Sequence, residues 1–138
     1  MGVLTVFLDK ITNLRDTDGM MNKADPYVKF ELEKDNWVFD KTPGKFTSSK
    51  KQNELSAVYG ETFTFENVPD TKNMVLHVKV MDDDYGLDDY MGGCDIKLNK
   101  LSLSEEPTDV EMVVDNKKGE GWFSKKAKIY LQISFKEE

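Results

Sequence analysis

Carboxylates gather at two places in the sequence. Residues 82–89 read Asp-Asp-Asp-Tyr-Gly-Leu-Asp-Asp, which puts five aspartates into eight positions. A second group contains Asp16, Asp18 and Asp25. Like charges this close together repel one another, so such a group costs stability unless a cation lies among the carboxylates. The two groups therefore predict a cation site.

The ligand types indicate which cation would bind. Calcium accepts six to eight oxygen ligands in flexible geometry, whereas magnesium demands a stricter octahedron, so acidic loops suit calcium better. Neither group contains His or Cys, the ligands that softer metals prefer. An EF-hand loop starting at Asp82 is excluded, because Leu87 stands where glycine is required and Gly93 where glutamate is required. We expect calcium, bound by loops of another kind.

Alternating apolar and polar residues around the acidic groups predict strands. The clearest run covers 129–135, and comparable runs cover 3–8, 27–32, 63–65, 74–80, 96–98 and 110–114. One buried face and one wet face are typical of antiparallel sheets. About eight such strands, separated by Gly, Pro, Asn and Asp, predict a sandwich of two sheets. A single helical turn is expected within 102–108, where Pro107 would end it.

Size, charge and cysteine content narrow the class of protein. The 138 residues suit one domain, so we expect 1–138 to fold as a unit. The net charge of −7 argues against a nucleic-acid partner, and against an anionic membrane unless a cation cancels it locally. The lone Cys94 forms no internal disulfide and no zinc site with the lone His77, which favours the cytosol. Neither a membrane-spanning helix of roughly 20 apolar residues nor a signal peptide is predicted.

Enzymatic activity is the function class with the least support. Ser and Thr are plentiful, but no base is placed to activate them. His77 alternates with core positions and is expected on the wet face of a strand, and Cys94 is expected to be packed. A metal without a nucleophile, a base or a pocket does not make an active site, so we predict a binding module.

Four motifs follow one another along nearly the whole chain. They are Leu4-x-Val6-x-Leu8-x-x-Ile11-x-x-Leu14, then Asp25-Pro26-Tyr27-Val28, then Ser-Ala-Val-Tyr-Gly-Glu-Thr-Phe-Thr-Phe at 56–65, and Val80-x-Asp82-x-Asp84 with Met91-Gly92. Together they resemble the C2 domain, a calcium-dependent lipid-binding β-sandwich. The resemblance implies an eight-stranded antiparallel Greek-key sandwich with calcium-binding loops at one end. It also implies the circularly permuted form, because no strand precedes the first motif and 129–135 would be the equivalent strand.

The resemblance further implies a ligand set for about two or three calcium ions. The implied carboxylates are Asp18, Asp25, Asp82 and Asp84 with Asp88 or Asp89, and the implied backbone carbonyls are those of Thr17 and Asp83. The first loop is one residue longer than is common, so Asp16 is an alternative to Asp18. The third loop is short after Asp84, which leaves Asp88 and Asp89 as alternatives. No ligand is assigned in the second loop, which departs from the family at four positions between 56 and 60.

Side chains near the acidic groups are candidates for membrane contact. Met20 and Met21 at the tip of the first loop would insert among acyl chains, unless they fold back onto the domain. Tyr85 and Leu87 would do the same from the third loop. The strands and turn between the two acidic loops include Lys29, Lys41, Lys45, Lys50 and Lys51. Family members carry a basic groove there that binds phosphoinositide head groups, and the alternative is a solvated face.

We therefore predict a calcium-switched module that binds anionic phospholipid membranes, and not nucleic acid. It would be cytoplasmic and become peripherally membrane-bound when calcium rises. The alternative hypothesis is a protein-interaction adaptor in which calcium only stabilises the loops.

Overall fold

The computed structural model describes residues 1–14, 25–34, 44–51, 56–83, 88–114 and 126–138. Within these residues the chain forms eight strands and one short 3-10 turn. The elements are β1 (Gly2–Thr12), β2 (Pro26–Lys34), β3 (Gly44–Thr47), β4 (Ala57–Val68), β5 (Met74–Asp82), β6 (Asp89–Lys97), η1 (Leu98–Lys100), β7 (Thr108–Val113) and β8 (Lys128–Glu137). No helix among the described residues is long and apolar enough to cross a membrane.

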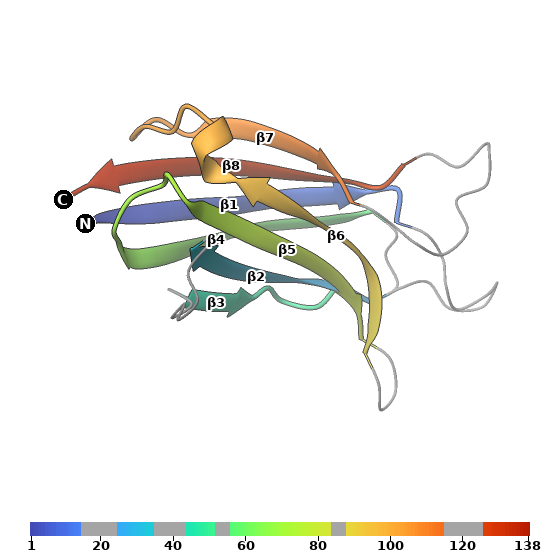
Figure 1. Cartoon of the computed structure of the whole chain (residues 1–138). Coiled ribbons are helices and arrows are strands. Elements are labelled where there is room, and N and C mark those ends of the chain that lie inside the picture. The colour runs from blue at the N-terminus through green and yellow to red at the C-terminus, as the bar shows by residue number, and fades with distance from the viewer. Residues whose placement is uncertain (15–24, 35–43, 52–55, 84–87, 115–125) are drawn as a thin grey trace, which may run out of the picture.

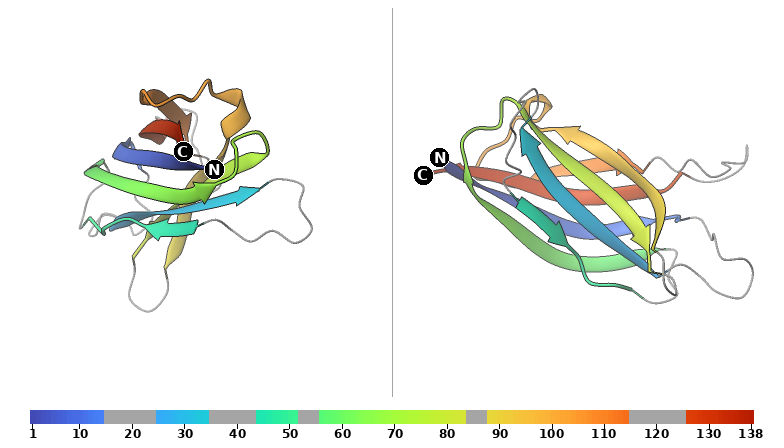
Figure 2. Two further views of the ribbon diagram at one scale, coloured as in Figure 1. Left: turned by 90° about the vertical axis from the view of Figure 1, so that its left-hand side faces the viewer. Right: turned by 60° about the horizontal axis from the view of Figure 1, so that its bottom comes forward.

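The strands form two four-stranded sheets that face one another (Figures 1 and 2). One sheet has the order β4-β1-β8-β7 and the other β3-β2-β5-β6, and every pairing is antiparallel. The chain changes sheet after β1, β3, β4 and β6, so strands far apart in the sequence become neighbours. This connectivity is a Greek key, and the predicted all-β sandwich is confirmed.

The last strand pairs with the first, as the permuted form of the fold requires. The register of β1 and β8 runs from Gly2 opposite Glu137 to Thr12 opposite Lys128. The two termini consequently lie side by side, and the Glu138 N–H donates to the Met1 carbonyl over 2.9 Å (Figure 2). Both termini are at one end of the sandwich, and the β5–β6 hairpin ends at the other (Figure 1).

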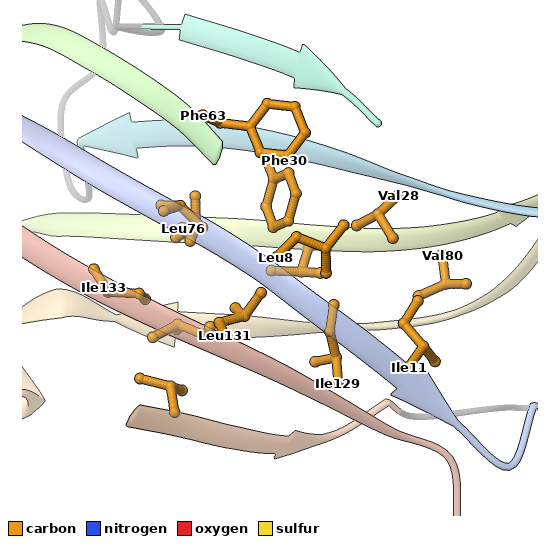
Figure 3. Packing of buried hydrophobic residues seen from close by; sticks show 14 of the residues in the cluster. Leu8, Ile11, Val28, Phe30, Phe63, Leu76, Val80, Ile129, Leu131 and Ile133 are labelled. Carbon is orange, nitrogen blue, oxygen red and sulfur yellow. The ribbon is translucent and has the colours of Figure 1, made fainter. Parts of the chain in front are cut away.

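The alternating apolar residues of both sheets meet in one core (Figure 3). Leu8 of β1 and Ile129 of β8 are fully buried, as is almost all of Phe30 of β2. The Phe30 ring packs on that of Phe63 with 5.2 Å between centroids. A shift of one residue in the register of any strand would expose its apolar side chains to solvent. The core therefore fixes the register, which in turn positions the residues at the strand ends.

In the β5–β6 hairpin, the strand pairing extends closer to the tip than the sequence predicts. The alternating run in the sequence covers only 96–98, but β6 begins at Asp89 and includes Gly92 and Gly93. Val80 pairs with Gly92 and Met81 pairs with Tyr90, so β6 carries one extra residue, a β-bulge. The bulge lets the pairing of β5 and β6 continue past Gly92 and Gly93. Asp82 and Asp89 are therefore strand residues and not loop residues.

Two smaller elements also differ from the sequence prediction. The helical turn is η1, at Leu98–Lys100, whereas residues 102–107 contain none. Leu98 extends the alternation of Ile96 in the sequence, and it is buried in the core although it belongs to the turn and not to β6. The strand β3 was not predicted, because it has only four residues and a single apolar side chain facing the core, Phe46.

Candidate functional site

The pairing of three strands brings the described acidic residues to one end of a sheet. Pro26 of β2 lies opposite Asp82 of β5, and Asp82 lies opposite Asp89 of β6. Asp25 precedes β2, Asp83 follows β5 and Asp88 precedes β6. We call these five residues, Asp25, Asp82, Asp83, Asp88 and Asp89, the acidic end. It lies away from both chain termini (Figure 1).

Asp82 joins the two acidic segments through its side chain. It is only 1% exposed, and its Oδ1 accepts a hydrogen bond from the Asp25 N–H over 2.9 Å. The Asp83 N–H in turn donates to the Asp25 carbonyl over 3.1 Å. A buried carboxylate is costly unless it is hydrogen-bonded. This bond therefore both satisfies Asp82 and fixes two segments that are 57 positions apart in the sequence.

Tyr27 holds Asp88 at the same end. Its hydroxyl donates a hydrogen bond to the Asp88 carboxylate. Burial raises the pKa of Tyr27 to about 12, with further contributions from this bond and from the charges of Asp88 and Asp83. Tyr27 is therefore protonated at neutral pH and remains a donor to Asp88.

Four of the predicted lysines are described, and they lie at different distances from the acidic end. Lys50 Nζ is 3.4 Å from Asp83 Oδ2 and 5.3 Å from the centre of the Tyr27 ring. Lys29 Nζ is 5.9 Å from the centre of the same ring. Lys51 lies over the Tyr59 ring at 5.5 Å. Lys45, on β3, is 4.0 Å from Glu31 and belongs to the outer face of the sheet rather than to the acidic end.

The predicted calcium ligands thus divide into two groups. The structure brings together Asp25, Asp82, Asp83, Asp88 and Asp89. The remaining predicted ligands, Thr17, Asp18 with its alternative Asp16, and Asp84, lie outside the described residues. So do Met20, Met21, Tyr85, Leu87 and Lys41.

The donor atoms at the acidic end fit a hard cation. Among the described residues, no three His, Cys, Asp or Glu side chains lie close enough to hold a metal, so the described carboxylates alone do not form a metal site. Every side-chain donor among the five is a carboxylate oxygen, the type that calcium prefers. His77 is five residues before Asp82 on β5, about 17 Å away along the strand, and its ring contacts Asp95 and Glu33 instead. Soft metals are thus disfavoured here.

Two tyrosines of the site were missed from the sequence. Tyr27 fixes Asp88, and the Tyr59 hydroxyl donates to the Pro26 carbonyl over 2.7 Å. The signal for Tyr27 was its place in Asp-Pro-Tyr-Val, directly after an acidic residue. Tyr59 stands where the C2 motif has a tryptophan, so an aromatic with a role at this position was also foreseeable.

Comparison with known proteins identifies the family. The C2 domain family model matches residues 2–124. The chain belongs to the C2 domain family. The acidic end is made by the starts of β2 and β6 and the end of β5, and it lies at the end of this C2 domain opposite the chain termini (Figure 1).

Relatives of this C2 domain include larger proteins. Mouse synaptotagmin-6 is 31% identical over 138 residues, covering 99% of this chain and 25% of the relative. The chain spans a quarter or less of the length of the curated relatives it matches. A solved C2 domain of plant extended synaptotagmin 1 has a TM-score of 0.77 at 24% identity, covering 98% of this chain and 94% of that one. A calcium-bound structure of the tandem C2 domains of extended synaptotagmin 2 has a TM-score of 0.68 at 21% identity, covering 97% and 45%. At these identities the two structures show a shared fold.

Proposed function

We propose that this C2 domain binds calcium at its acidic end and then docks on anionic phospholipid membranes. The observation that carries the proposal is the pairing of Pro26 with Asp82 and of Asp82 with Asp89, which collects carboxylates from two distant segments at one end. The proposed ligands are Asp18, Asp25, Asp82, Asp84 and one of Asp88 and Asp89, with the carbonyls of Thr17 and Asp83. The calcium-bound state of a structural relative supports the choice of ion.

Charge cancellation is the proposed switch. Without calcium, the acidic end and the net charge of −7 oppose approach to an anionic surface. About two or three calcium ions bring roughly four to six positive charges and reverse the local sign. Each lysine near the surface then adds about 1 kcal/mol. Lys29 and Lys45 on the sheet face are proposed to contribute in this way, together with Lys41, Lys50 and Lys51.

Apolar loop residues would complete the docking. Met20, Met21, Tyr85 and Leu87 are proposed to enter the interfacial region once the charge is cancelled. The protein would then be peripherally bound to the membrane at high calcium and released when calcium is chelated.

The test separates calcium binding from docking. Calcium is first titrated into the protein by calorimetry without lipid, and sedimentation is then measured with phosphatidylcholine vesicles with and without phosphatidylserine. We expect calcium to bind in the micromolar to millimolar range and the protein to sediment only with calcium and phosphatidylserine present. Absence of calcium binding would refute the site. Calcium binding without sedimentation would favour the adaptor hypothesis.

A further inference from the structure

The segment that follows β3 is tied to β2 although it is not part of a strand. The Ser48 N–H donates to the Val28 carbonyl and the Val28 N–H donates to Ser48 Oγ, each over 2.8 Å. The Lys51 N–H donates to the Pro26 carbonyl over 3.0 Å. These bonds hold residues 48–51 beside the start of β2, next to the acidic end.

A second tie fixes the same segment to the other sheet. The Ser49 N–H donates to Glu61 Oε1 over 3.0 Å, and the Ser49 hydroxyl donates to the other oxygen of that carboxylate. Glu61 lies on β4. Lys50 is thus presented from a backbone that is anchored on both sides, which limits the positions that its ammonium group can reach.

The Lys50 ammonium group occupies a place among the acidic side chains. It is 3.4 Å from Asp83 Oδ2 and lies over the Tyr27 ring, whose hydroxyl binds Asp88. The Lys50 side chain is 52% exposed and that of Asp83 is 39% exposed. The ammonium group therefore contacts residues linked to both the end of β5 and the start of β6, and enough of it is exposed to let it leave.

From this placement we propose that Lys50 is an internal counter-cation of the acidic end. It balances Asp83 while calcium is absent, competes with calcium by charge repulsion, and is released toward lipid phosphate when calcium binds. The inference rests on the proposed calcium-dependent docking and adds its regulation: one lysine lowers calcium affinity in solution and strengthens membrane binding afterwards. Lys50 is a tuning residue, because exposed ion pairs are weak and would not block calcium.

The test uses substitutions that separate charge from position. Lys50→Met removes the ammonium group and keeps an apolar stem, Lys50→Arg keeps the charge, and Lys79→Met removes a charge from an exposed position on β5. Calcium affinity is measured by calorimetry without lipid. We expect Lys50→Met to bind calcium about 3–10-fold more tightly, since one nearby like charge is lost. Lys50→Arg and Lys79→Met should stay within about twofold of the parent.

The second measurement is sedimentation with phosphatidylserine vesicles at saturating calcium. Lys50→Met should then bind vesicles about fivefold more weakly, because one lysine contact of about 1 kcal/mol is lost. Opposite changes in the two affinities are the signature of the proposal, since a variant damaged in its fold would lose both. Unchanged calcium affinity in Lys50→Met, or an equal gain in Lys79→Met, would overturn the inference while leaving the proposed function intact. A parent protein that binds no calcium would refute both.

Discussion

At the scale of single residues, Asp82 combines a structural and a proposed binding role. Its buried carboxylate accepts the Asp25 N–H, and it is also a proposed calcium ligand. The two roles have different chemical requirements, because the hydrogen bond needs only an acceptor oxygen whereas calcium binding also needs the negative charge. Substitutions that keep or remove the oxygen can therefore separate them.

We predict that Asp82→Asn loses at least about tenfold in calcium affinity but unfolds like the parent in chelator. Asp82→Ala should lose calcium binding too, and should also lower the free energy of unfolding by about 1–3 kcal/mol, because the partly buried Asp25 N–H loses its acceptor. Calorimetry and urea unfolding measure the two effects. Equal stability of the two variants would show that the hydrogen bond contributes little, and parental calcium binding by Asp82→Asn would remove Asp82 from the ligand set.

Cys94 gives a prediction that is independent of calcium. Burial, and to a lesser extent the charge of Asp95, raises the pKa of its thiol from 9.0 to about 11. The thiol therefore stays protonated to a higher pH in the folded state than in the unfolded state. Its contribution to the free energy of unfolding is complete below pH 9 and is lost between pH 9 and 11. Iodoacetamide should react slowly at about pH 8 and faster across that window. Cys94→Ser should show a smaller fall in unfolding free energy over the same window, and an equal fall in both proteins would contradict the prediction.

At the scale of elements, alternation predicts long strands well and short or interrupted ones poorly. β1 and β8 were predictable because each contributes a full row of core residues. The start of β6 was not, because Gly92-Gly93 reads as a break in a linear sequence. Its pairing depends on a bulge that forms only against β5.

The same limit applies to the candidate site. The acidic residues and their element ends were visible in the sequence, because loops that collect carboxylates stand out by composition. Their partners were not visible: Tyr27 meets Asp88, and Lys50 meets Asp83, only because β2, β5 and the segment after β3 are brought side by side. Contacts of this kind depend on register between distant strands, which no local pattern encodes.

Alanine substitutions at two separate glycines, Gly93 and Gly60, test how far the β5–β6 pairing positions the acidic end. A Cβ on Gly93 would lie 2.4 Å from the Val78 carbonyl oxygen, so Gly93→Ala must displace β6 from β5. Gly60 has a φ of +62° but open space around its Cβ position, so Gly60→Ala incurs only the backbone penalty of about 1–2 kcal/mol. We expect Gly93→Ala to lower the urea midpoint more and to weaken calcium binding, whereas Gly60→Ala should keep parental affinity. Parental calcium affinity in Gly93→Ala would show that close pairing of β5 and β6 at Gly93 does not position Asp89.

At the scale of the whole molecule, the sandwich separates its two ends. The termini lie together at one end and the acidic residues at the other (Figure 1). A membrane approached by the acidic end would thus leave both termini pointing away from it. The proposed docking in that orientation would have an electrostatic part from calcium and the lysines and an apolar part from Met20, Met21, Tyr85 and Leu87. The two parts would respond differently to salt.

Met20 and Met21 allow the apolar part to be removed alone. Thioether side chains offer no oxygen to a hard cation, so the double substitution to Ser should leave calcium affinity in solution within about twofold of the parent. Each fully buried Met contributes roughly 1.5–3 kcal/mol and a loop tip realises part of this, so calcium-dependent vesicle binding should weaken about tenfold or more. Residual binding should depend more steeply on salt, because only charge interactions remain. Vesicle binding equal to that of the parent would show that the two methionines are not anchors. Docking would then rest on calcium and lysine contacts with lipid phosphate, and Lys50→Met should become the more damaging change.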